Sequence, residues 1–153
     1  MRLLLLLLLL LSLCVPVSAD SLQNPDGKAR CAVCGMFVAP YPNWLAVLEA
    51  DDGQRYYFDG PKDLFICFRD LPKYLPGVDA RTAKLYVTEY YTTRMLPATE
   101  VFFVTGSDVL GPMGQELVPV AGRATAETFR VDHAGAKLLR FDGRELIDAT
   151  EAQ

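Results

Sequence analysis

The sequence has few of the residues that common catalytic sites require. Its 153 residues include a single histidine, His133, and neither a serine, histidine and acid grouping nor a paired-carboxylate pattern stands out. Basic residues are outnumbered, with 15 against 19 acidic ones, which gives a formal net charge of -4. Such a chain offers no basic surface to a nucleic-acid backbone. We therefore expect neither an enzyme nor a nucleic-acid-binding protein.

Long apolar runs are scarce as well. A membrane-spanning helix needs about 20 consecutive apolar residues, and no segment of the chain reaches that length. The longest run consists of the leucines at positions 3–11, which follow Arg2 and precede Val17, Ser18 and Ala19. A positive start, a short apolar stretch and a small-residue cleavage site are typical of an export signal. We expect residues 1–19 to be a signal peptide, the mature protein to be periplasmic, and no membrane span.

Cysteine is sparse too, and its number is informative. The chain has 4 cysteines, and cleavage of the signal would remove Cys14 and leave Cys31, Cys34 and Cys67. An alternative route would anchor a lipoprotein through Cys14, but Leu13 is bulky where a lipoprotein signal has a small residue. An odd number of cysteines cannot all pair, so at least one exported thiol is free, buried or bound to another group.

Two of these cysteines lie at residues 31–36, in the order Cys-Ala-Val-Cys-Gly-Met, which concentrates sulfur atoms in a short segment. Gly35 leaves the backbone free to turn, so that the sulfurs of Cys31, Cys34 and Met36 can converge. Two prolines shortly after the segment keep it in a loop near the surface. Soft sulfur ligands favour Cu(I), and thiolates also suit zinc. The leading interpretation is a Cu(I) site.

Other interpretations of this segment stay open. A thiol-disulfide oxidoreductase using Cys31 and Cys34 would need a lowered thiol pKa, most often supplied by a helix N-terminus or a nearby cation, and prolines follow here instead. Structural zinc would need Cys67 or His133, because the chain has no second pair of cysteines at this spacing. A predicted helix end explains His133 without a metal. Met36 also suits the first core position of the next segment.

The first half of the chain predicts the order strand, strand, helix, strand. Apolar and aromatic runs on either side of an acidic turn are typical of a β-hairpin. Pro61 suits the first turn of a helix whose Leu64, Phe65 and Phe68 share one face, and Cys67 fits there as a small buried side chain. The expected segments are strands at 44–49 and 55–58, the helix from 61, a loop at 71–81 and a strand at 84–91.

The second half repeats this order. The expected segments are strands at 101–105 and 117–120, a helix at 125–133 and a strand at 137–141. Thr125 suits the start of that helix and Gly135 its end. We therefore predict an α+β fold made of two ββαβ units that form one compact protein after signal cleavage. The predicted divisions are the signal peptide at 1–19, a flexible tether at 20–30, and units at 31–92 and 93–153.

A methionine stands between the strands that open the second unit. The loop at 106–116 holds glycines and a proline around Met113, where a thioether has no packing role that leucine would not fill better. A surface position without function is also compatible with this pattern. If the two related units face one another across a pseudo-twofold axis, Met113 comes toward the loop at 31–36. The sequence then predicts Met113 as a further sulfur ligand beside Met36.

These residues resemble the nitrous oxide reductase accessory protein family, NosL. The resemblance rests on residues 31–38, 57–63, 86–91 and 106–114. It implies an exported, non-catalytic Cu(I)-binding metallochaperone, with a fold of paired ββαβ units, that assists assembly of the copper centres of nitrous oxide reductase. The partners it implies are that copper-accepting enzyme and other copper-handling proteins. Carried over by position, the metal ligands of the family fall on Cys31, Cys34, Met36 and Met113.

The chain departs from the family pattern at two points. Many relatives have a histidine where this chain has Gln115, so a nitrogen ligand from that position is in doubt. Many are also lipoproteins, whereas the signal here favours cleavage after Ala19 and a mature protein without an anchor.

Overall fold

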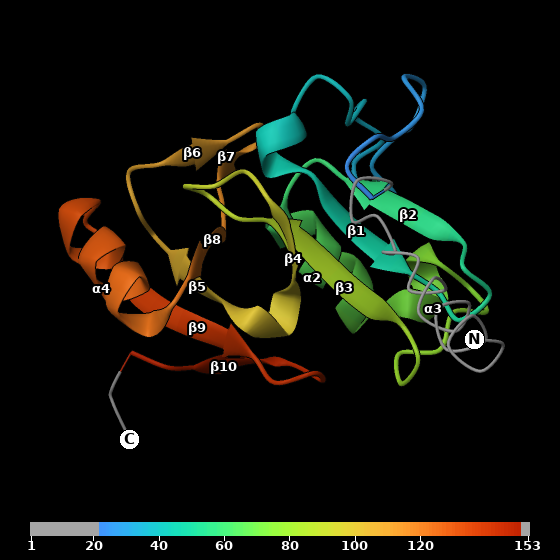
Figure 1. Cartoon of the computed structure of the whole chain (residues 1–153). Helices are drawn as coiled ribbons and strands as arrows, with labels where there is room; N and C mark the ends of the chain where they lie inside the picture. Colours follow the sequence, from blue (N-terminus) through green and yellow to red (C-terminus); the bar gives the residue numbers. More distant parts are fainter. Residues whose placement is uncertain (1–21, 151–153) are drawn as a thin grey trace, which may run out of the picture.

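The computed structural model describes residues 22–150. The predicted signal peptide, Cys14 included, lies outside the described residues. Within them, two four-stranded antiparallel sheets lie side by side, one from each half of the chain, and a helix packs on each (Figure 1). None of the helices in this range is long and apolar enough to cross a membrane. The arrangement confirms the predicted α+β fold.

The first sheet contains the predicted hairpin. Its strands are β1 (Ala46–Glu49), β2 (Arg55–Phe58), β3 (Lys84–Thr88) and β4 (Met95–Pro97), in the order β2-β1-β3-β4. Strand β1 lies between two neighbours and is almost wholly buried, which explains its continuous apolar run. The hairpin register pairs Ala46 with Phe58. The chain therefore leaves β2 close to the start of β1, and this end of the hairpin leads into the next helix.

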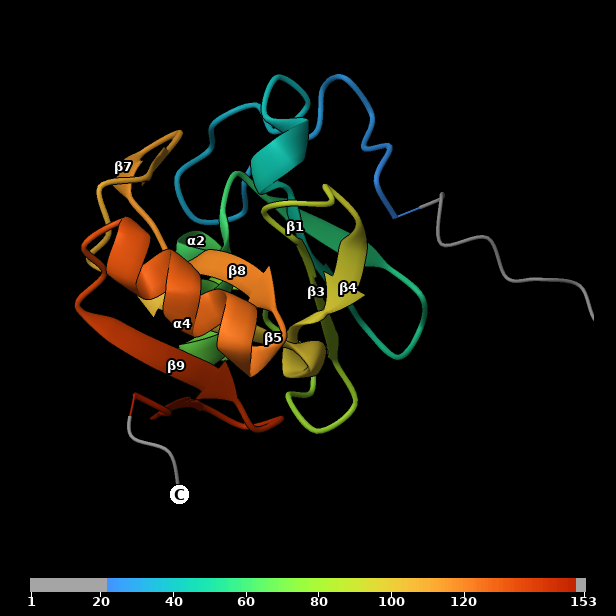
Figure 2. The ribbon, with the colours of Figure 1, turned by 60° about the vertical axis from the view of Figure 1, so that its left-hand side comes forward.

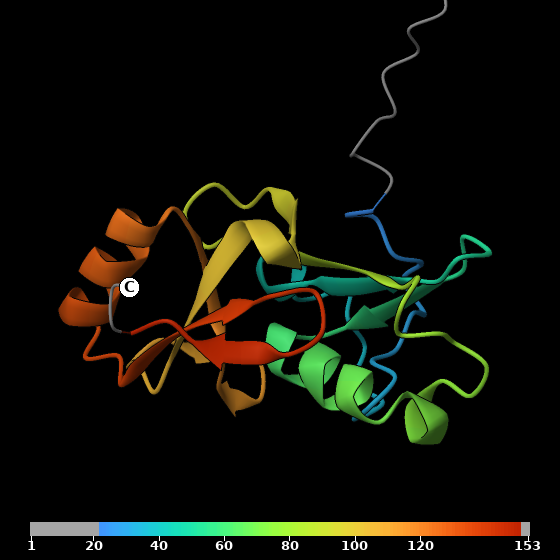
Figure 3. The same cartoon turned by 90° about the horizontal axis from the view of Figure 1, so that it is seen from below.

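Helix α2 (Pro61–Arg69) covers one face of the first sheet and lies beside the turn between the last two strands (Figure 3). A proline occupies its first turn, as predicted, because proline there costs no helical hydrogen bond. Its buried Phe65 packs edge-on against Phe103 of the second sheet, with ring centroids 5.1 Å apart. Phe68 contacts Phe141 in the same way, at 5.5 Å. One helix thus contributes to the core of both halves.

The second half repeats the order of the first. Its sheet has the strand order β10-β9-β5-β8, and helix α4 lies across it (Figure 2). The elements are β5 (Val101–Thr105), β8 (Val118–Ala121), α4 (Arg123–Asp132), β9 (Lys137–Phe141) and β10 (Leu146–Asp148). The predicted ββαβ order is confirmed in both halves, and each sheet gains one short edge strand, β4 or β10. The unit boundary at residue 92 stays a prediction.

Three predicted boundaries were wrong by two residues or more. The strand expected at 44–49 begins at Ala46, because Trp44 belongs to the 3-10 helix Pro42–Trp44. The strand expected at 84–91 stops at Thr88, because the Glu89 carboxylate accepts hydrogen bonds from the backbone N–H and the hydroxyl of Thr92 and closes a turn. The helix expected from Thr125 begins two residues earlier. There Gly122 adopts a φ of 78°, a left-handed conformation that favours glycine, and turns the chain from β8 into α4.

Regular structure that was not predicted occurs in four further segments of residues 22–150. The loop expected at 71–81 begins with the short helix α3 (Leu71–Tyr74), which buries Leu71 and has a proline in its first turn. Short 3-10 helices form at η2 (Pro42–Trp44) and η3 (Ala98–Glu100). The loop around Met113 contains a small hairpin, β6 (Leu110–Gly111) with β7 (Gly114–Gln115).

The described part of the predicted tether contacts the rest of the protein. The Gln23 side-chain amide donates a hydrogen bond to the Thr93 carbonyl at 2.8 Å. Leu22 and Ala29 pack against the core, and Arg30 forms an isolated β-bridge with Phe37. The flexibility of residues 20–30 stays a prediction.

Candidate metal centre

The loop at residues 31–36 closes on itself through backbone hydrogen bonds. The Cys31 N–H donates to the Met36 carbonyl at 2.8 Å, and the Gly35 N–H donates back to the Cys31 carbonyl at 2.9 Å. Gly35 has a φ of 77°, a left-handed conformation that favours glycine, which agrees with the expected turn at this residue. The turn buries the Cys31 side chain to 3% exposure and leaves Cys34 exposed. The two thiols therefore stand at different depths of one loop.

Each thiol contacts the carboxylate of an aspartate. Cys31 Sγ lies 3.3 Å from Asp63 Oδ2, and Cys34 Sγ lies 3.4 Å from Asp59 Oδ1. One ligand atom from each of these four side chains lies within 4.8 Å of the other three. Asp59 follows β2 directly, and Asp63 stands in the first turn of α2. We call these four residues the thiol–carboxylate cluster.

Neither aspartate was among the site residues predicted from the sequence. The residues around Pro61 were interpreted as the start of a helix, and no ligand role was assigned to the two carboxylates there. Their contact with the cysteines is tertiary, since the Ala32 N–H donates to the Tyr57 carbonyl at 3.3 Å and lays the loop beside the end of β2. Local patterns do not contain that contact.

The cluster holds its thiols in the protonated form. Burial raises the pKa of the Cys31 thiol far above its ordinary value, and the neighbouring Asp59 carboxylate raises it further. Burial is also the largest cause of the raised pKa of Cys34, with Asp63 and Asp59 adding to it. Both thiols therefore carry a proton at neutral pH, and a metal that binds them must displace it. A redox-active cysteine pair needs the opposite shift.

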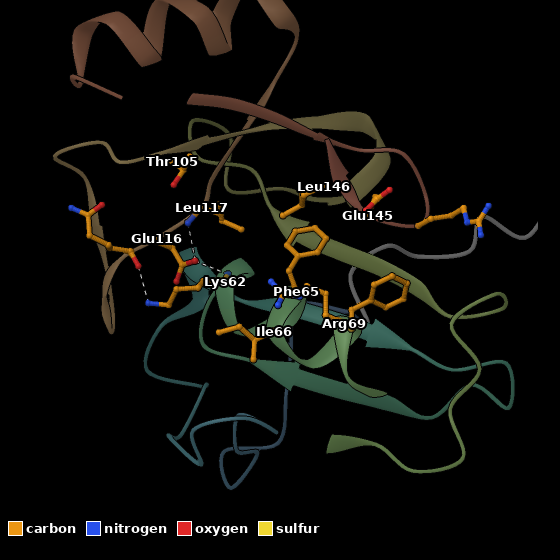
Figure 4. A pocket seen from close by; sticks show the side chains of 12 residues that line it. Lys62, Phe65, Ile66, Arg69, Thr105, Glu116, Leu117, Glu145 and Leu146 are labelled. Atoms are coloured by element: carbon orange, nitrogen blue, oxygen red, sulfur yellow. Dashed lines mark hydrogen bonds between the residues drawn. The ribbon is translucent and has the colours of Figure 1, made fainter. Parts of the chain in front are cut away.

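The small hairpin that carries Met113 is fastened to the N-terminus of α2. Glu116 Oε1 accepts hydrogen bonds from the backbone N–H groups of Lys62, at 2.6 Å, and Leu117, at 2.9 Å. Lys62 Nζ donates to the Gln115 carbonyl at 2.7 Å (Figure 4). Lys62 is the neighbour of Asp63 in the chain. The hairpin is thus anchored one residue from the cluster.

The two methionines differ in accessibility. Met36 is half-buried within the loop, and Met113 is 50% exposed in the turn between β6 and β7. The hairpin is anchored beside α2, and the expected approach of Met113 to the loop at 31–36 stays a prediction. The ligand roles of Cys31, Cys34, Met36 and Met113 stay predictions.

We expect the stability of the protein to depend on pH through the titration of Glu116. Burial raises its pKa from 4.5 to about 7, so the folded protein holds this proton more tightly than the unfolded chain does. This proton contributes up to roughly 3 kcal/mol to the free energy of unfolding. The contribution is fully present below pH 4.5 and is lost as the pH rises through 7. Glu116→Gln should remove this loss. Urea unfolding of both proteins across this range checks it, and parallel pH profiles would contradict it.

His133 and Gln115 lie in ordinary structural surroundings. His133 ends α4, where its Nδ1 lies 2.9 Å from Asp108 Oδ1 and its ring packs 4.2 Å from that of Phe129. The Gln115 amide donates to the Ser107 carbonyl at 3.3 Å, within its own loop. Neither belongs to the thiol–carboxylate cluster.

Cys67 is fully buried in α2 and lies outside the cluster. Replacing it with alanine removes one small apolar group, so we expect Cys67→Ala to lower the free energy of unfolding by roughly 1 kcal/mol and to leave metal affinity unchanged. Chemical unfolding and a metal titration of the same variant measure the two effects. A loss of metal binding would move Cys67 into the site.

Comparison with known proteins gives two findings. The family model described as NosL matches residues 23–146. The chain is also similar to the crystal structure of the copper chaperone NosL from Shewanella denitrificans, at 27% identity and a TM-score of 0.65. That similarity covers 78% of this chain and 92% of the other. No curated protein matches the sequence. The region matched by the family model includes the whole thiol–carboxylate cluster.

Proposed function

Because the chain belongs to the NosL family, we propose that it is an exported metallochaperone that binds one Cu(I) and passes it to a copper enzyme. The acceptor that the family points to is nitrous oxide reductase, and the role is delivery, not catalysis. The similar Shewanella denitrificans protein is itself a copper chaperone. The proposed ligands are Cys31 and Cys34, completed by Met36 or Met113.

The observation that carries this proposal is the unequal depth of the two thiols. Cys31 is buried, whereas Cys34 is exposed at the edge of the same cluster. A chaperone must hold its ion yet allow the ligands of an acceptor to replace its own one at a time. The buried thiolate suits retention of Cu(I), and the exposed one is the first that an acceptor can displace.

The donor set also fits the cargo. Thiolate and thioether sulfurs are the ligands that Cu(I) prefers. The carboxylates of Asp59 and Asp63 accept the thiol protons as hydrogen bonds before the ion arrives. The alternative function, a thiol-disulfide oxidoreductase, needs a lowered thiol pKa, and burial raises the pKa of both cysteines instead.

A transfer experiment tests the proposal. Purified protein loaded with Cu(I) is incubated with copper-depleted nitrous oxide reductase, and the copper content of each protein is measured after separation. We expect copper to move to the enzyme from the wild type, whereas Cys34→Ser should carry too little copper to transfer. Rapid reduction of a disulfide substrate by metal-free wild type, without copper transfer, would favour the oxidoreductase.

Export is part of the proposal and has its own test. Cleavage after Ala19 should give a mature periplasmic protein that begins at Asp20, because the residues before it fit a signal cleavage site. The intact mass of the protein recovered from the periplasm measures this directly. A mass that corresponds to an acylated N-terminal Cys14 would contradict it.

A further inference from the structure

A cleft of about 610 Å³ lies between α2 and the second sheet, and Lys62, the chain neighbour of the cluster residue Asp63, lines it (Figure 4). Its volume is in the range of typical ligand pockets. Residues of α2 form one wall, and the end of β5, the segment 115–117 that leads from β7 to β8, and the turn between β9 and β10 form the others. None of the proposed copper ligands lines it.

The floor of the cleft is apolar. Phe65, Phe68, Leu117 and Leu146 line it, and Ile66 at the rim remains 39% exposed. An exposed isoleucine beside an apolar hollow is surface that a partner can remove from water. The floor therefore fits one or two apolar side chains.

The rim of the cleft is basic although the whole chain has a formal net charge of -4. Lys62, Arg69 and Arg144 stand around it, and Arg69 and Arg144 make no ion pair with a carboxylate among residues 22–150. Glu116 is buried and directs its carboxylate to backbone N–H groups, so Glu145 is the one exposed acid at the rim. The cleft thus favours an anionic partner.

The spacing of the cations favours an anion with more than one charged group. Lys62 and Arg69 lie seven residues apart in α2, with Ile66 between them on the same face. At the helical rise of about 1.5 Å per residue, their backbones are roughly 10 Å apart. Two cations at this spacing, with Ile66 between them, match two acidic side chains that flank an apolar one in a peptide.

From this combination of charge and shape we propose that the cleft docks a partner protein through a peptide segment with acidic side chains on either side of apolar ones. The apolar side chains bury themselves on Phe65 and Leu117, and the carboxylates contact Lys62, Arg69 and Arg144. Lys62 of the cleft and Asp63 of the thiol–carboxylate cluster are neighbours in the first turn of α2, so the two sites adjoin the same helix end. The docking itself does not depend on bound metal, so it stands apart from the proposed function.

The test uses a short fluorescent peptide of alternating glutamate, leucine and phenylalanine residues, titrated with metal-free full-length protein. We expect saturable binding that weakens as salt is added, since the rim charges are exposed to solvent. The double substitution Arg69→Glu with Arg144→Glu should weaken binding about tenfold or more. Arg94→Glu makes the same kind of charge change at an exposed arginine outside the cleft and should bind like the wild type.

Each other result overturns the proposal. Absence of binding to the wild type, equal binding of a peptide with lysine in place of glutamate, or equal binding to the Arg69 and Arg144 variant would each contradict it. Saturable binding of a fatty-acid carboxylate probe in place of the peptide would assign the cleft to a small amphiphile. Self-association at rising concentration without peptide binding would assign it to a second copy of this chain.

Discussion

Replacing Cys31 or Cys34 with serine is expected to weaken Cu(I) binding by orders of magnitude, and far more than replacing Met36 or Met113 with leucine. A thiolate binds Cu(I) with both its charge and its softness, whereas a neutral thioether contributes softness alone. Serine also leaves a hydroxyl beside two carboxylates, which is a hard donor set. The affinity of the wild type should rise with pH, because burial raises the pKa of both thiols and binding displaces their protons.

Competition against a chromophoric Cu(I) chelator under reducing conditions measures these affinities. The matched control is Cys67→Ala, which removes a buried thiol that lies outside the cluster, and His133→Ala should be equally silent. Unchanged Cu(I) affinity in the variant that lacks both Cys31 and Cys34 would rule out the assigned site.

The second large expected effect is on stability, at the contact between Glu116 of the second half and the N-terminus of α2 in the first half. A Cβ atom at Gly60 would collide with the Glu116 carboxylate, which is held by the Lys62 and Leu117 N–H groups. The Gly60 backbone is extended, with a φ of -170°, so alanine suffers no backbone strain there. Gly60→Ala should therefore act only by displacing Glu116. We expect it to lower the free energy of unfolding by about 2 kcal/mol, because two partly buried N–H groups lose their acceptor.

A double-mutant cycle isolates this cause. Once Glu116→Ala has removed the carboxylate, a further Gly60→Ala substitution should cost almost nothing. Gly27→Ala is the control, since no atom lies near the position of its Cβ and its φ is not left-handed. Urea unfolding of the four cycle proteins and the control gives the free energies. Full additivity of the two substitutions would show that Gly60 matters for another reason.

The elements that local sequence determines were predictable. The hairpin of β1 and β2 follows from two β-forming runs on either side of an acidic turn, and α2 follows from Pro61 and the spacing of its apolar residues. The second half gave the same order because the same local patterns recur there. Short edge strands were missed, since β4 and β10 contain only three residues each and form through pairing with a neighbour.

The candidate site was predictable only in part. The spacing of Cys31 and Cys34 is local and identifies a sulfur pair without any structure. Their unequal burial and their contacts with Asp59 and Asp63 depend on how the loop lies against α2, and no local pattern carries that information. The link from Glu116 to the N-terminus of α2 spans 54 residues and is equally invisible in the sequence.

X-ray absorption spectroscopy of the protein loaded with one equivalent of Cu(I) tests the central claim most directly, because it identifies the atoms bound to the ion. Sulfur scatterers should dominate the first shell, with contributions from Cys31 and Cys34 that disappear when both are replaced by serine. A first shell of oxygen or nitrogen in the wild type, without sulfur, would contradict the assignment of the cluster as a Cu(I) site.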